Sequence, residues 1–312
     1  MGEILAVFSA FFYGASNIYV NHGIIEDKLN RYEGLFVSLV VNNTFNLIIL
    51  PFYLIYIDLP VYNFWGLFFY VLAGILTSFL ARVLLFSSIE KVKASRASVL
   101  KITAPVFTVI LGVTVLNEKL NVFELIGILI VLGGVLITTL DSQRLVTDDK
   151  NSISSNMVSK ANLISNKTLK LGIILGILAG LSLGAGNVFR KLGTDFYGSP
   201  FIGVVVGSIV SLIFVTIFSL LTNQLDITKV LKKENFSYSY VVVGIWYSLA
   251  TYSIFVALDL APVSIVNSLS STQPIFAIIL SVIILKKHDL ITLRLVFGSL
   301  VVIAGSFLIF IN

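Results

Sequence analysis

The sequence predicts an all-α integral membrane protein whose ten transmembrane helices form two inverted five-helix repeats. Three observations predict this fold: long apolar runs, few charged residues, and a match between the two halves of the chain. Of the 312 residues, 57% are hydrophobic and 12% are charged, and the mean hydropathy is +1.00. The charged share is about half that of a soluble globular protein, which excludes a soluble enzyme, a disordered chain and a secreted disulfide scaffold.

Ten apolar runs are long enough to cross a bilayer as helices, which takes about 20 residues each. None shows the alternating polarity of a transmembrane strand. The expected spans are 3–22, 34–57, 65–89, 94–116, 122–140, 170–190, 198–222, 238–258, 262–285 and 290–311. Residues 141–169, rich in Ser, Asn, Asp and Lys, are expected to form a flexible linker.

The two halves of the chain match each other at a nearly constant offset. A shift of 170 residues places Gly14–Tyr19 on Gly184–Phe189, and a shift of 169 places Thr103–Phe107 on Thr272–Phe276. Several matches in the same order indicate an internal repeat.

We therefore expect residues 1–140 and 170–312 to form the two repeats, joined by the linker. Because five is an odd number of spans, the second repeat enters the bilayer with the opposite orientation. This architecture is typical of secondary transporters.

Two five-helix repeats, first helices rich in small residues, and proline-centred fourth helices followed by an acid (Glu118, Asp289) resemble the EamA-like transporters. These belong to the drug/metabolite transporter superfamily. The resemblance implies export or uptake of small metabolites, often amino acids or related solutes. It also implies a central cavity lined mainly by spans 1, 3, 4, 6, 8 and 9. The loop before Asp289 is two residues longer than the one before Glu118, which departs from the repeated pattern.

Charged side chains within the spans indicate where a solute could bind. Arg82 and Lys101 each lie about eight residues from the connection between spans three and four, roughly 12 Å deep at 1.5 Å per residue. At that shared depth they predict a site for a carboxylate or phosphate. The alternative is that both side chains extend to the lipid headgroups.

Polar residues inside the spans are further candidates, either for substrate contact or for packing between helices. The candidates for substrate contact are Asn17, Asn187, Gln273, Tyr13, Tyr247, Tyr252 and Asn267. Pro105 and Pro274 are candidate hinges, because proline frees the carbonyl four residues earlier. Asn42, Asn43 and Asn46 are expected to join span two to its neighbours.

These features favour a secondary carrier that moves a small zwitterionic or anionic metabolite by alternating access. The alternative is a non-transporting membrane sensor or partner protein. The sequence has no cysteine, only two histidines, no P-loop and no HExxH motif. We therefore expect no enzyme activity, no metal, no cofactor, no ATP and no nucleic acid. The expected partners are a small-molecule substrate and the lipid bilayer, and a homodimer is left open.

The distribution of Lys and Arg predicts the orientation. Lys119, Arg190 and Lys191 are assigned to the side that carries both termini, against fifteen on the other side. The positive-inside rule then puts the termini outside and the linker in the cytoplasm. We expect a multi-pass protein in the cell membrane of a prokaryote.

Overall fold

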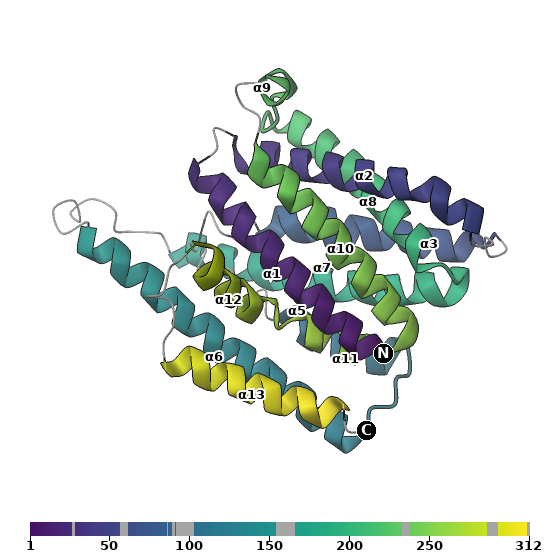
Figure 1. Cartoon of the computed structure of the whole chain (residues 1–312), viewed down its shortest axis with the longest axis vertical. Coiled ribbons are helices and arrows are strands. Elements are labelled where there is room, and N and C mark those ends of the chain that lie inside the picture. Colours follow the sequence, from purple (N-terminus) through teal and green to yellow (C-terminus); the bar gives the residue numbers. More distant parts are fainter. Residues whose placement is uncertain are drawn as a thin grey trace.

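The computed structural model describes residues 1–26, 29–56, 62–85, 87–88, 91, 103–153, 166–232, 237–285 and 293–310. Helices and short turns make up this part of the chain, and it contains no strand (Figure 1). The elements are α1 (Gly2–Glu26), α2 (Arg31–Tyr56), α3 (Phe64–Gly74), η1 (Ile75–Leu80), α5 (Thr103–Val115), α6 (Val122–Ile153), α7 (Asn166–Tyr197), α8 (Pro200–Leu221), α9 (Ile227–Leu231), α10 (Tyr238–Leu260), α11 (Val263–Ser270), α12 (Gln273–Leu285) and α13 (Leu293–Phe310).

Six helices among the described residues are long and apolar enough to cross a bilayer. Three shorter helical stretches, 103–115, 122–137 and 297–309, are also apolar. Large apolar side chains such as Ile48, Phe52, Leu129, Ile213 and Phe297 are exposed on the outer surface of the bundle. Such a surface suits contact with lipid, so the chain is a multi-pass integral membrane protein.

Helix α7 runs well past the expected end of its span at residue 190. It stops at Gly198, whose φ of 71° suits glycine and whose N–H donates to the carbonyl of Thr194 at 2.7 Å. Ser199 then caps α8 by accepting a hydrogen bond from Ile202 N at 3.3 Å. The true boundary between these spans is therefore this turn, and Arg190 lies inside α7.

The expectation of a flexible linker over residues 141–169 can be compared with the structure only at its two ends, because residues 154–165 lie outside the described residues. Helix α6 continues to Ile153 and α7 begins at Asn166, so both helices extend into this segment. The segment contains neither glycine nor proline, the residues that most often end a helix. Its polar composition therefore does not interrupt the helices where the apolar runs end.

Two spans depart from a regular α-helix. The third contains a π-helical stretch, η1, in which Ala81 N donates to the carbonyl of Leu76. The ninth is divided by a turn at Ser271 and Thr272 into α11 and α12. Non-helical backbone within a membrane protein is tolerated where it is buried in protein or lines a polar space, and π-helical turns often occur at functional sites.

Glycines permit two matching close contacts between the halves of the chain. A Cβ atom at Gly14 would lie 2.9 Å from the carbonyl oxygen of Gln273, so α1 and α12 touch through their backbones. A Cβ at Gly184 would lie 2.8 Å from the carbonyl oxygen of Ala104, so α7 and α5 touch likewise. Gly14 pairs with Gly184 and Gln273 with Ala104 in the repeat alignment. In each contact, the first helix of one half packs against the fourth span of the other half.

The remaining helices pack alongside these pairs and complete a bundle. Helices α6 and α13 lie side by side at one edge, and α1 lies along α10 (Figure 1). The start of α1 and the end of α13 lie at the same end of the bundle (Figure 1). A chain with both ends on one side of a membrane crosses it an even number of times.

Asparagine side chains join α2 to its neighbours, as the sequence predicted. Asn42 Nδ2 donates to Ser248 Oγ on α10 at 2.8 Å, and Asn43 Nδ2 donates to the carbonyl of Ser208 on α8 at 3.1 Å. Asn46 Nδ2 donates to Ser208 Oγ at 3.2 Å. The expectation that these three asparagines connect helices is confirmed.

Candidate functional site

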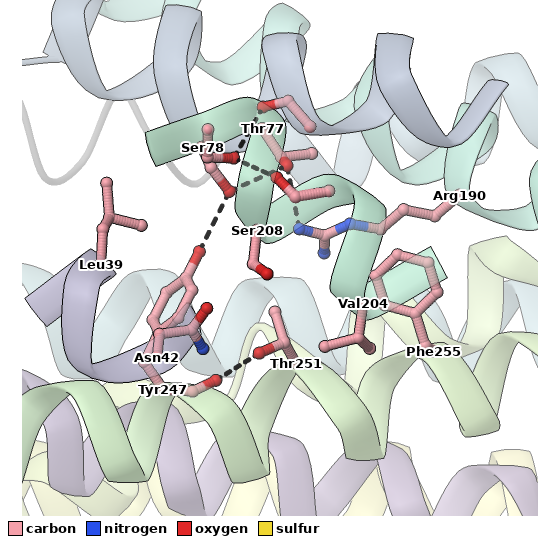
Figure 2. Close-up of a pocket in the computed structure, with 13 residues that line it drawn as sticks. Leu39, Asn42, Thr77, Ser78, Arg190, Val204, Ser208, Tyr247, Thr251 and Phe255 are labelled. Carbon is pink, nitrogen blue, oxygen red and sulfur yellow. Dashed lines mark hydrogen bonds between the residues drawn. The ribbon is translucent and has the colours of Figure 1, made fainter. Parts of the chain in front are cut away.

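A small cavity with both polar and apolar residues in its wall lies between the helices (Figure 2). Its wall comes from α2, α3, η1, α7, α8 and α10, and consists of Leu39, Asn42, Gly74, Thr77, Ser78, Arg190, Val204, Gly207, Ser208, Ser211, Tyr247, Thr251 and Phe255. This wall uses spans 2 and 7, which the family resemblance did not suggest, and lacks spans 1, 4 and 9, which it did. The space that the centre of a water molecule can reach is about 20 Å³. It suits about one ordered water, so a metabolite needs a more open arrangement of the helices.

Arg190 is the charged group of the cavity wall, and only 5% of its surface is exposed. Figure 2 shows its guanidinium pointing from α7 into the cavity. Its Nη2 donates to Thr77 Oγ1 at 2.9 Å, its Nη1 donates to Asn187 Oδ1 at 3.1 Å, and its Cζ lies 5.2 Å from the ring centroid of Phe255. Arg190 forms no ion pair with any carboxylate in the part of the chain that the structure describes.

A chain of amides and hydroxyls runs from Arg190 to α5. Asn187 Nδ2 donates to Asn267 Oδ1 on α11 at 2.7 Å, and Asn267 Nδ2 donates to Thr108 Oγ1 at 2.6 Å. Thr108 in turn donates to the carbonyl of Ala104 at 3.0 Å. These buried contacts hold α7, α11 and α5 together. Asn187 and Asn267, both predicted site residues, thus lie in direct contact with each other.

A second group, on the other side of the cavity, surrounds Tyr247. Its hydroxyl lies 3.3 Å from Ser78 Oγ, which in turn lies 3.3 Å from Thr77 Oγ1 (Figure 2). The guanidinium carbon of Arg82 lies 4.5 Å from the centroid of the Tyr247 ring, and the Tyr13 ring packs edge-on at 5.4 Å. The Arg82 side chain therefore contacts a residue of the cavity wall.

Glu118, in the turn after α5, contacts the start of α11. Its carboxylate accepts hydrogen bonds from Val263 N, from Ser264 N at 3.2 Å and from Ser264 Oγ at 2.6 Å, which caps the N-terminus of α11. Gly2 of α1 packs against Ala261, two residues before Val263. The Glu118 contact therefore lies at the same end of the bundle as the start of the chain.

Other predicted site residues lie apart from this cluster. Asn17 is exposed, whereas its repeat partner Asn187 is 3% exposed. Tyr252 is 45% exposed and packs edge-on against Phe201 at 6.0 Å. Gln273 is partly buried at the first position of α12. Lys101 lies outside the described residues, so its pairing with Arg82 stays a prediction.

The two candidate hinges occupy different settings. Pro274 is the second residue of α12 and follows the turn that divides the ninth span. Pro105 is buried in the first turn of α5, a helix that continues without a break to Val115. A break between two helices thus accompanies the second proline, whereas residues 92–102, which precede α5, lie outside the described part.

Sequence reasoning missed Arg190, Thr77 and Ser78. Arg190 was placed at the end of its expected span and counted on the side that carries both termini. The spacing of Asn187 and Arg190 was a usable signal, since residues three apart share one face of a helix. The two hydroxyl residues carried no comparable signal, because serine and threonine are common in membrane helices. No group of three or more His, Cys, Asp or Glu suited to a metal occurs among the described residues.

Comparisons with known proteins give one family. The model described as the EamA-like transporter family matches the chain in two parts, residues 1–140 and 170–311. One solved structure, titled only "Crystal structure of protein", is similar over 98% of this chain and 94% of its own, with a TM-score of 0.71 and 11% sequence identity. It is one of 28 similar chains, and at that identity the likeness shows the fold alone. No curated protein matches the sequence.

Proposed function

The chain belongs to the EamA-like transporter family, and from this premise we propose that it is a secondary carrier for a small zwitterionic or anionic metabolite. Transport proceeds by alternating access between two inverted repeats of five helices, residues 1–140 and 170–312, which make ten spans. The family supports a membrane transporter of the drug/metabolite type, and the finer statements rest on the arguments below.

The contacts between the halves support the inverted repeat. The close approach of Gly14 to Gln273 has its counterpart in that of Gly184 to Ala104. A twofold relation between the halves explains why both contacts occur, because it maps α1 against α12 onto α7 against α5. Rocking of one half against the other would then exchange the two arrangements.

Asn17 and Asn187, which are equivalent in the repeat alignment, differ in exposure, and this difference supports alternating access. Asn187 is buried in the hydrogen-bonded chain to Thr108, whereas Asn17 is exposed past the middle of α1. We infer that the end of the bundle at Glu118 is closed in this arrangement and that the end toward Asn17 is open. A carrier in one of its two states would have this asymmetry.

Arg190 is the observation that carries the substrate assignment. A buried guanidinium without a carboxylate partner among the described residues favours a ligand that brings negative charge. Neutral donors and acceptors on Asn42, Ser208 and Thr251 line the same cavity and suit the polar remainder of a small metabolite.

The orientation of the chain is also a proposal. Arg190 and Lys191 both lie inside α7, which leaves Lys119 on the side of the termini against fifteen cations on the other. The positive-inside rule then still puts the termini outside, so the open end at Asn17 faces the cytoplasm. The membrane is proposed to be the cell membrane of a prokaryote.

The test is transport by the purified full chain in proteoliposomes. We expect saturable, temperature-dependent uptake of at least one amino acid or organic acid from a broad panel, and its loss in Arg190→Gln. Absence of saturable uptake across the panel would favour the alternative, a non-transporting membrane sensor or partner.

Labelling of single cysteines tests alternating access separately, because the natural sequence has no cysteine. Asn17→Cys is expected to react quickly with a soluble maleimide and Thr108→Cys slowly. A transported solute should shift the two rates in opposite directions. Rates that rise or fall together would contradict alternating access without bearing on transport itself.

A further inference from the structure

We propose that the transported metabolite carries two negative charges, and that Arg190 and Arg82 each bind one of its anionic groups. A dicarboxylate and a phosphate monoester share this chemistry. This inference rests on the proposed carrier function and narrows its substrate class from zwitterions and anions to doubly charged oxyanions.

The buried guanidinium of Arg190 is the reason for the first negative charge of the metabolite. Its guanidinium is buried, and its two hydrogen bonds described above go to neutral oxygens of Thr77 and Asn187. Neutral partners satisfy N–H groups without neutralising the charge, and an uncompensated buried cation is strongly unfavourable. The planar guanidinium suits a carboxylate or phosphate, which can accept two parallel hydrogen bonds.

The guanidinium of Arg82 is the reason for the second negative charge of the metabolite. Its guanidinium is partly buried against the face of the Tyr247 ring, and it forms no ion pair with a described carboxylate. A cation–π contact compensates a cation less than an anion does. Arg82 is therefore a second positive group next to a residue of the cavity wall.

Tyr247 lies between this second group and the cavity. Its ring contacts Arg82, while its hydroxyl reaches Ser78 inside the cavity at 3.3 Å, which is long for a bond between hydroxyls (Figure 2). Because that bond is weak, rotation of the ring gives an anion in the cavity access to Arg82. The cavity must enlarge for any metabolite to bind, and this rotation is one way to enlarge it.

The cavity wall also argues against a zwitterion. Among the described residues that line it, none is Asp, Glu or His. The ammonium group of an amino acid would therefore meet neutral oxygens in the presence of two guanidinium groups. A monoanion would neutralise one arginine and leave the other, whereas a dianion neutralises both.

The experiment compares uptake of four labelled probes by proteoliposomes at constant ionic strength: succinate, glycerol 3-phosphate, gluconate and serine. We expect saturable uptake of at least one dianion, with a half-saturating concentration at least about tenfold below those of gluconate and serine, as one additional ion pair allows. Preference for succinate or for glycerol 3-phosphate tells a dicarboxylate from a phosphate ester.

Two variants test which arginine binds each anionic group of the metabolite, and a third variant is the control. Arg190→Gln should abolish uptake of every anion. Arg82→Gln should raise the half-saturating concentration of the dianion about tenfold while leaving gluconate nearly unchanged, which a purely structural role would not produce. Arg294→Gln is the matched control, because Arg294 is exposed on α13. Size-exclusion profiles should show that all three variants fold.

The possible failures are distinguishable. Saturable uptake of serine at lower concentration than either dianion overturns this inference and leaves the carrier function intact. An equal effect of Arg82→Gln on dianion and monoanion also overturns it. Absence of saturable uptake for all four probes overturns it as well, and the broader panel then decides whether the carrier function falls with it.

Discussion

The Nη2 group of Arg190 donates a hydrogen bond to Thr77 Oγ1 at 2.9 Å, which joins the charged face of α7 to the π-helical stretch η1. Thr77 also donates to the carbonyl of Ala73 at 2.8 Å. A threonine with both bonds is fixed in orientation, so it fixes the guanidinium in turn. Thr77 is therefore a positioning residue for Arg190.

Thr77→Val tests this positioning role. Valine keeps the shape of threonine but removes the acceptor, and an unsatisfied buried N–H costs about 1–3 kcal/mol. We expect the half-saturating concentration for uptake to rise about tenfold while the protein stays folded. Thr216→Val is the control, because the Thr216 hydroxyl bonds to Leu212 in its own helix. Equal effects of the two substitutions would contradict the role of Thr77.

The repeat partners Asn187 and Asn17 should contribute unequally to stability. Asn187→Leu leaves an amide oxygen of Asn267 and a donor of Arg190 without their partner. We expect the free energy of unfolding to fall by about 1–3 kcal/mol. Asn17→Leu, at an exposed position, should change it by less than about 0.5 kcal/mol. Circular dichroism of thermal or denaturant unfolding in detergent measures both, and a larger loss for Asn17 would contradict the asymmetry.

Glu118 should control the closed end of the bundle. Glu118→Gln keeps the shape but removes the charge that accepts hydrogen bonds from Val263 and Ser264. Hydrogen bonds to a charged group contribute about 1.5–3 kcal/mol, so the closed arrangement should lose population. We expect maleimide to label Thr108→Cys at least about fivefold faster in the Glu118→Gln background. Glu124→Gln is the control, since Glu124 exchanges hydrogen bonds with Asn121, three residues away. An unchanged labelling rate would show that Glu118 does not hold this end closed.

Pro274 should set the rate of the conformational change. Alanine restores a backbone N–H, which allows a bond to the carbonyl of Ser270 and a continuous helix through the turn at Ser271 and Thr272. We expect Pro274→Ala to lower the maximal uptake rate several-fold with little change in the half-saturating concentration. Pro51→Ala is the control, because Pro51 lies within the continuous helix α2. A higher half-saturating concentration with an unchanged maximal rate would instead indicate a role in binding.

Much of the architecture follows from the sequence because its signals are local. A run of about 20 apolar residues must form a helix in lipid, whatever surrounds it. The first helix of each half, rich in small residues, packs closely on a helix of the other half at Gly14 and at Gly184. Helix ends were less predictable, since α7 continues to Tyr197, just before Gly198, and the polar segment after residue 140 lacks glycine and proline.

The site itself depends on contacts between distant parts of the chain, which no local pattern encodes. Asn187 and Asn267 were identified from the sequence as separate polar residues in apolar spans, but only the packing of α7 on α11 makes them hydrogen-bond partners. The sequence also could not reveal that Asn17 and Asn187, equal in their repeats, would be exposed and buried. Hydrophobicity along the chain fixes which segments enter the membrane, whereas the burial of a charge such as Arg190 depends on which helices surround it.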